Sequence, residues 1–209
     1  MNPPLVSLHP GEFRCLEFRQ ETGFRGKNAV VWLHGIGERG HELPLVAKYG
    51  LPAALLEGRV TADADVICPQ LEADMEWEPS RTKELLSGLS AEYSALALIG
   101  FSLGGLGVCE LLAQYGPQAD VHVAIAAQTR RRVTASQTNS NFLSVSGEHD
   151  PWHAMAQYIR EFQTLGGLGE QVVLPNEGHF ISETALKHPK FVSALLSIGI
   201  SFSWNPKED

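Results

Sequence analysis

The stretch ALALIGFSLGG, residues 95–105, carries the strongest structural signal in this chain. An apolar run leads into the pattern G-x-S-x-G, in which Gly100 and Gly104 flank Ser102. A serine at a sharp strand-to-helix turn has a strained backbone, and the residues two before and two after it must be very small. Apolar residues at helical spacing follow at 103–115. The stretch therefore predicts a strand, a tight turn with Ser102 at its tip, and a helix.

Apolar runs alternate with helix-length stretches through most of the chain. Runs without polar alternation are typical of strands covered on both faces, as in parallel sheets. The predicted strands are 28–33, 64–68, 95–99, 121–126, 141–145 and 171–174, with one antiparallel strand within 12–19. The predicted helices are 80–93, 103–115, 152–165 and 184–196. This alternation indicates an α/β fold with a mostly parallel sheet and helices on both faces.

Length and composition fit one globular domain over residues 1–209. The chain is 44% hydrophobic and 19% charged, and a chain of 209 residues can bury a substantial core. A formal net charge of −8 argues against a nucleic-acid-binding surface. The three cysteines form no CxxC pair, and no run resembles a secretory signal or a membrane span. We therefore expect a cytoplasmic protein with neither nucleic acid nor membrane as a partner.

Two later loops supply the groups that a nucleophilic serine needs. A serine is a weak nucleophile without a base and an orienting acid, which follow it in the order acid, then histidine, in this architecture. The segment SGEHDPW after strand 141–145 contains Glu148 and Asp150, and PNEGHF after strand 171–174 contains His179. Both loops follow parallel strands, so they open on the same sheet edge as Ser102. Ser102, Asp150 and His179 are the predicted catalytic residues.

The other histidines fit the role of base less well. His122 lies inside an apolar strand and is better explained as a hydrogen-bonded core residue. His149 and His153 are four residues apart, but a metal site would need more ligands nearby. The histidines without a catalytic context are His9, His41 and His188. We therefore expect no metal and no organic cofactor.

A glycine-rich segment, VVWLHGIGERG at 30–40, predicts the site for a developing oxyanion. A strand that ends in His-Gly exposes a backbone N–H, which we assign to Ile36, and the second N–H comes from Leu103, directly after the nucleophile. Residues 35–40 also match the dinucleotide pattern G-x-G-x-x-G. No acidic residue follows at the position that this pattern requires, so the match carries little weight.

These motifs together resemble the α/β-hydrolase superfamily, and within it the small carboxylesterases, lysophospholipase-like esterases and dienelactone-hydrolase-like proteins. The resemblance rests on the segments 33–40, 68–77, 100–105, 146–152 and 177–180. It implies a single-domain α/β-hydrolase fold and hydrolysis of a small-molecule carboxylic ester through an acyl-enzyme. The core elements occupy almost all of the 209 residues and leave no long insertion for a large lid, so we expect soluble esters with a short- to medium-chain acyl group. Dienelactone hydrolase carries cysteine where Ser102 stands, so the resemblance does not extend to that activity.

Two tryptophans are candidates for the substrate pocket. Trp77 lies in a tract that borders the pocket in the relatives, and Trp152 follows the proposed acid. Each also has a structural interpretation, in which Trp77 covers an edge of the core and Trp152 packs the first turn of the next helix. Arginines 130–132 are either a solvated patch or a site for a substrate carboxylate or phosphate.

The motif leaves other activities open. A thioesterase, a peptidase or an acyltransferase would use the same three residues, because substrate choice depends on the shape of the pocket. A ligand-binding protein on the same scaffold is a further alternative, although a pure binder does not need all three residues.

The two carboxyl groups of the loop after strand 141–145 make the assignment of the acid testable. Pro151 restricts Asp150 to an extended backbone, which helps to direct its short side chain, whereas Glu148 is expected to face solvent. Asp150→Asn should lower kcat for a soluble ester by about 10⁴, the effect of losing the charge that orients the histidine. Glu148→Gln should lower it less than about tenfold. The reverse order would make Glu148 the acid.

Overall fold

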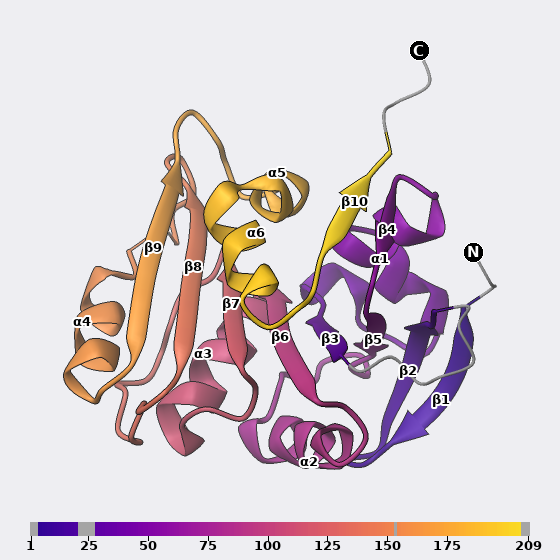
Figure 1. Cartoon of the computed structure of the whole chain (residues 1–209), viewed down its shortest axis with the longest axis horizontal. Helices are drawn as coiled ribbons and strands as arrows, with labels where there is room; N and C mark the ends of the chain where they lie inside the picture. The colour runs from indigo at the N-terminus through magenta and orange to yellow at the C-terminus, as the bar shows by residue number, and fades with distance from the viewer. Residues whose placement is uncertain (1–3, 21–27, 153, 206–209) are drawn as a thin grey trace.

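The computed structural model describes residues 4–20, 28–152 and 154–205, and its centre is an eight-stranded sheet (Figure 1). The strand order is β1-β2-β5-β3-β6-β7-β8-β9. The strands are β1 (Leu5–His9), β2 (Phe13–Phe18), β3 (Asn28–Leu33), β5 (Asp65–Pro69), β6 (Ala95–Phe101), β7 (Val121–Ile125), β8 (Asn141–Gly147) and β9 (Leu168–Leu174). From β5 to β9 all neighbours are parallel, while β1 and β2 are antiparallel. The predicted mostly parallel sheet is confirmed.

Helices cover both faces of this sheet. The first layer contains α2 (Pro79–Ser90), α3 (Leu103–Tyr115) and α4 (Ala156–Thr164), and the second contains α1 (Gly50–Leu56), α5 (Ser182–Lys187) and α6 (Pro189–Leu196). In Figure 1 the helices α5 and α6 lie in front of the sheet. Along β3, Val30 and Trp32 enter one core while Val31 and Leu33 enter the other. Covering on both faces explains why these strands read as continuous apolar runs.

Three short strands have no counterpart in the sequence analysis. They are β1 at the sheet edge and the pair β4 (Val60–Ala62) and β10 (Phe202–Trp204), which form a separate antiparallel two-stranded sheet. β4 and β10 have three residues each, too few to show a period, and β1 is exposed or half-buried along its length, so it is not a buried apolar run. In the residues that the structure describes, no helix has the length and hydropathy needed to cross a membrane.

Two helix predictions are wrong at their boundaries. The helix expected over 152–165 begins at Ala156, because the Trp152 N–H donates to Asp150 Oδ1 at 3.0 Å and residues 150–152 form a turn. The helix expected over 184–196 is two helices that meet at His188 and Pro189. Proline has no N–H to continue a helix, and the preceding residue avoids the helical region, as the extended backbone of His188 shows (φ −68°, ψ 135°).

The loops that follow β8 and β9 pack directly against each other. The Glu148 N–H donates to the Leu174 carbonyl at 2.9 Å, and the His149 N–H donates to the Glu177 carbonyl at 2.8 Å. Gly147 allows this contact, since a Cβ there would lie 2.2 Å from the Gly178 carbonyl oxygen. The two loops therefore form one unit above the edge of the sheet.

Adding one methyl group at this contact should separate the two loops. We expect Gly147→Ala to lower the free energy of unfolding by about 2 kcal/mol, the usual cost of overpacking, because backbone atoms must shift. Gly178→Ala is the matched control, because no atom lies within 4 Å of its added Cβ, and it should change stability by less than about 0.5 kcal/mol. Urea unfolding measures both, and equal losses would contradict this description of the contact.

Candidate active site

Ser102 lies at the tip of the turn between β6 and α3. Its backbone has φ 54° and ψ −112°, in a region that non-glycine residues rarely adopt, at a cost of about 1–3 kcal/mol. The turn is held on both sides: the Ser102 N–H donates to the Ile125 carbonyl at 2.8 Å, and the Leu106 N–H donates to the Ser102 carbonyl at 3.0 Å. The predicted strand, turn and helix are all present.

Close backbone contacts explain the two glycines of the motif. A Cβ on Gly100 would lie 2.2 Å from the carbonyl oxygen of Gly104, across the turn. A Cβ on Gly104 would lie 1.9 Å from the carbonyl oxygen of Leu33, at the end of β3. No side chain fits at either position, and the second contact places the turn directly against the loop that follows β3.

The structure brings the three predicted catalytic residues into one chain of hydrogen bonds. Nε2 of His179 lies 2.9 Å from Oγ of Ser102, and Nδ1 of His179 lies 2.9 Å from Oδ2 of Asp150. With the proton on Nδ1, the histidine donates to Asp150 and its Nε2 can accept the hydroxyl proton of Ser102. The Asp150 side chain is buried, and that of His179 is 23% exposed. Asp150 is therefore shielded from solvent, while the imidazole of His179 remains accessible.

Glu148, the other candidate for the acid, points away from this chain of hydrogen bonds. Its Oε2 accepts a hydrogen bond from the Asn176 N–H at 3.0 Å, on the exposed side of the two packed loops. The carboxylate thus supports the turn after β9 rather than the imidazole.

The two predicted oxyanion donors belong to segments that adjoin Ser102. Leu103 is the first residue of α3, and Ile36 begins the short 3₁₀ helix η1 (Ile36–Glu38) next to Gly35. An ideal Cβ on Gly35 would be 3.5 Å from the Ser102 Cβ, so this loop adjoins the nucleophile. Neither the Ile36 nor the Leu103 amide has an acceptor among the residues that the structure describes. Both amides are thus available to a ligand.

Buried side chains hold the loop that carries Ile36. The neutral ring of His34 donates from Nδ1 to the Gly35 carbonyl (2.7 Å) and accepts at Nε2 from the Leu71 N–H (3.0 Å). Burial lowers the pKa of His34 to about 4, so the ring stays neutral near pH 7. The Gly35 N–H donates to Oε2 of Glu38 at 2.8 Å, and Glu38 is itself buried.

The carboxyl group of Glu38 titrates unusually. Burial raises its pKa from 4.5 to about 7, although the Gly35 N–H and the positive charge of Lys48 both favour the ionised form. The oxyanion loop therefore contains a carboxyl group whose charge changes near neutral pH.

The two predicted pocket tryptophans occupy different environments. Trp77 is buried, donates from Nε1 to the His34 carbonyl at 3.1 Å, and forms part of a cleft of about 430 Å³ together with Leu103 and Leu106. Trp152 is 43% exposed and lies edge-on to the ring of His179, with centroids 5.0 Å apart. Trp152 does not belong to the first turn of a helix, since α4 begins four residues later.

The three consecutive arginines each pair with a glutamate. The pairs are Arg130 with Glu76 (Nη1–Oε2 2.9 Å), Arg131 with Glu110, and Arg132 with Glu161 (Nε–Oε1 3.9 Å). These pairs connect the loop after β7 to its neighbours. Arg130 and Arg131 also line the cleft beside Trp77, but the glutamates Glu76 and Glu110, which line it too, already pair with their charges.

Sequence reasoning missed several residues that contact the site. Glu38 lies within the quoted motif, three residues after Gly35, at a spacing from which a side chain can accept the backbone N–H. Phe101 and Phe180 adjoin Ser102 and His179 in the sequence, and their rings lie 5.5 Å from the ring of His179. No group of potential metal ligands occurs among the described residues, and His153, one half of the weighed histidine pair, lies outside them.

Comparison with known proteins identifies the fold. No family model and no curated protein sequence matches this chain, but solved structures do. A thermostable esterase is 15% identical with a TM-score of 0.67, over 93% of this chain and 62% of that one. The Bacillus cereus carboxylesterase is 17% identical (TM-score 0.58, 80% and 86%), and an alpha-beta serine hydrolase homologue from Coxiella burnetii is 15% identical (TM-score 0.54, 88% and 91%). This chain thus spans less than two thirds of the thermostable esterase, and at these identities the likeness shows the fold alone.

Removing the buried carboxyl group of Glu38 should change how stability depends on pH. The folded protein binds this proton more tightly than the unfolded chain, so the contribution of Glu38 to stability falls as pH rises from about 4.5 to about 7. Glu38→Gln has no such charge. Its free energy of unfolding, measured relative to that of the parent, should therefore be higher at pH 8 than at pH 5 by on the order of 2 kcal/mol.

Urea unfolding at the two pH values measures this gain. Glu42→Gln removes an exposed carboxyl group from the same segment and serves as the control for the change in net charge. A difference between Glu38→Gln and the parent that stays constant from pH 5 to pH 8 would show that Glu38 does not titrate in this window.

Proposed function

We propose that this chain, which has the α/β-hydrolase fold, is a serine hydrolase that cleaves carboxylic esters. The observation that carries the proposal is the pair of hydrogen bonds that connects Ser102 to His179 and His179 to Asp150. Each of the two is 2.9 Å long. Esterases among the structural neighbours support hydrolysis at this coarse level.

The first half-reaction forms an acyl-enzyme. Nε2 of His179 accepts the hydroxyl proton while Oγ of Ser102 attacks the ester carbonyl carbon, and Asp150 stabilises the resulting imidazolium. The carbonyl oxygen becomes an oxyanion that accepts hydrogen bonds from the amides of Ile36 and Leu103. When the tetrahedral intermediate collapses, the carbon–oxygen bond to the alcohol breaks, and His179 gives its proton to the leaving oxygen.

The second half-reaction releases the acid. Water gives a proton to His179 as its oxygen attacks the acyl carbon, and the same two amides hold the second oxyanion. Collapse then breaks the bond to Oγ of Ser102, which recovers its proton from His179. Side chains and amides of this chain, together with water, account for every proton transfer.

The substrate that we propose is a small soluble ester with a short- to medium-chain acyl group. The cleft of about 430 Å³ adjoins Leu103, the proposed oxyanion donor, and has room for a group of this size. Trp77, Leu103 and Leu106 give it an apolar side, and the paired charges of Glu76, Glu110, Arg130 and Arg131 line the rest. The same residues could act on thioesters or amides, or could transfer the acyl group to an acceptor other than water. A purely ligand-binding role is less favoured, because it gives no reason to keep Ser102 in a strained conformation beside a histidine.

An activated serine should react with a fluorophosphonate probe. We expect one equivalent of label on Ser102, whereas Ser102→Ala should take up none and lose about 10⁶ in turnover of a soluble ester. Ser87→Ala, which changes an exposed serine on α2, should label like the parent. Mass spectrometry of the labelled peptides measures the site, and a folded parent chain that takes up no label would favour the ligand-binding alternative.

A further inference from the structure

We propose that a cleft beside His179, walled by Tyr49, Phe101 and Phe180, binds an aromatic ring in the alcohol part of the ester. The inference rests on the proposed function, because it assigns one part of the substrate to one side of the same site. The cleft has a volume of about 310 Å³, which is within the range of small-molecule sites.

Three aromatic rings follow one another from the nucleophile to the protein surface. Phe101 precedes Ser102, and its ring centroid lies 6.4 Å from that of Phe180, which in turn lies 6.2 Å from that of Tyr49. The rings are tilted by 40° and 49° relative to their neighbours. Aromatic side chains contact a further ring favourably in tilted or offset arrangements, so this wall suits an aromatic ligand better than a flexible chain.

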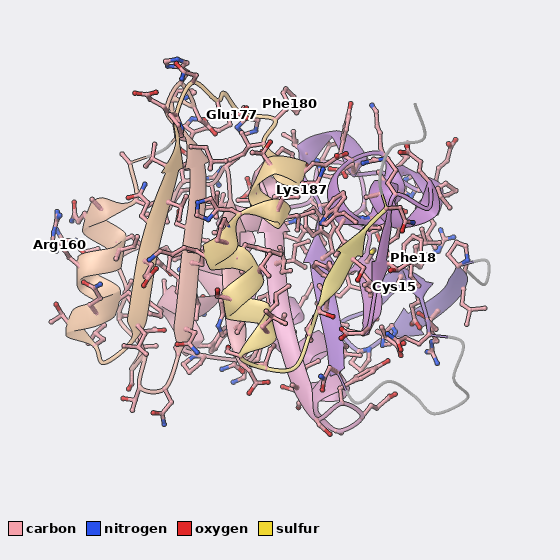
Figure 2. All side chains as sticks on the ribbon, turned by 45° about the horizontal axis from the view of Figure 1, so that its top comes forward. Cys15, Phe18, Arg160, Glu177, Phe180 and Lys187 are labelled. Atoms are coloured by element: carbon pink, nitrogen blue, oxygen red, sulfur yellow. The ribbon has the colours of Figure 1, made fainter. Side chains whose placement is uncertain are left out.

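The exposure of these rings indicates that the wall is incomplete without a ligand. Phe101 is 4% exposed, but Tyr49 is 38% and Phe180 is 78% exposed. Phe180 belongs to the loop after β9, where Figure 2 shows it close to Glu177 at the end of the sheet that carries the site. A ring bound in the cleft would remove apolar surface of Tyr49 and Phe180 from water.

The direction of proton transfer decides which part of the ester occupies this cleft. The leaving oxygen must accept the proton from Nε2 of His179, so the alcohol group extends on the histidine side. Phe101 and Phe180 both lie 5.5 Å from the His179 ring, and both line this cleft. Leu103, an oxyanion donor, lines the other cleft, which therefore remains for the acyl group.

The charges around the cleft favour an uncharged ligand. Arg59 already forms two ion pairs, since its Nε lies 2.5 Å from Oε2 of Glu57 and its Nη1 lies 2.6 Å from Oε1 of Glu183. Lys48 places its ammonium 5.1 Å from the centre of the Tyr49 ring. These two cations and two carboxylates leave the rim of the cleft without net charge, so the rim does not favour an alcohol group that carries a charged substituent.

Four esters separate the contribution of an aromatic ring from that of apolar size. Benzyl acetate and cyclohexylmethyl acetate differ in the alcohol group, while methyl phenylacetate and methyl cyclohexylacetate carry the same two rings in the acyl group. In each pair the leaving alcohols are similar in acidity, so the ratio of kcat/KM values reports binding of the ring near the transition state.

The parent chain should have a higher kcat/KM for benzyl acetate than for cyclohexylmethyl acetate. Phe180→Leu keeps an apolar side chain but removes the ring, and it should reduce the ratio of these two kcat/KM values by about fivefold. Tyr49→Leu should reduce it in the same direction. Neither variant should change the ratio of the acyl pair by more than about twofold. Leu168→Ala shortens an exposed apolar residue at the start of β9, at the opposite end of this strand from the loop that contains Phe180, and it should leave both ratios unchanged.

Each contrary result has a distinct meaning. If Phe180→Leu changes the acyl ratio instead, the cleft holds the acyl group and the proposal is wrong. If neither ratio changes while esters are still cleaved and Ser102 is labelled, the cleft binds no ring and the proposal is wrong, but the proposed function stands. If no ester is cleaved and Ser102 is not labelled, the proposed function itself fails.

Discussion

The strained turn at Ser102 is the constraint on which the rest of the site depends. A positive φ at a serine is costly, and it persists here because the surrounding packing leaves no alternative. Gly104 lies against the carbonyl of Leu33, so the nucleophile and the loop after β3 are held in one relative position. That contact sets where the amides of Ile36 and Leu103 lie relative to Oγ, so in the proposed reaction these donors would already be in place.

A buried polar network keeps the oxyanion loop in place at some cost in stability. His34 remains neutral in the core, and Glu38 holds the Gly35 N–H although burial opposes its charge. An apolar side chain at position 38 would avoid that cost but would leave the Gly35 N–H without its acceptor. Stability and the geometry of the oxyanion donors thus make opposite demands on this position.

Much of this arrangement could be predicted from the sequence, because strong local constraints leave clear patterns. Gly100, Ser102 and Gly104 identify the turn, and the order of strands places Asp150 and His179 at the same sheet edge. Features set by tertiary packing could not be predicted in the same way. The tilt of Phe180 toward Tyr49 depends on two loops that are distant in the sequence, as does the turn that delays α4. The break between α5 and α6 has a signal in the sequence, since Pro189 disfavours a continuous helix. The apolar periodicity on both sides of it favours one helix instead, which is why the break was not predicted.

The position of β9 has a consequence for how activity is lost under stress. In the part of the chain that the structure describes, β9 is the last strand of the sheet and pairs only with β8. Edge elements open with less free energy than the centre of a domain, so hydrogen exchange should be faster in β9 than in β6. His179 lies in the loop that follows β9, and opening of this strand would separate the imidazole from Ser102 while the central strands remain folded. Heat or denaturant would therefore disrupt the proposed active site before the core unfolds.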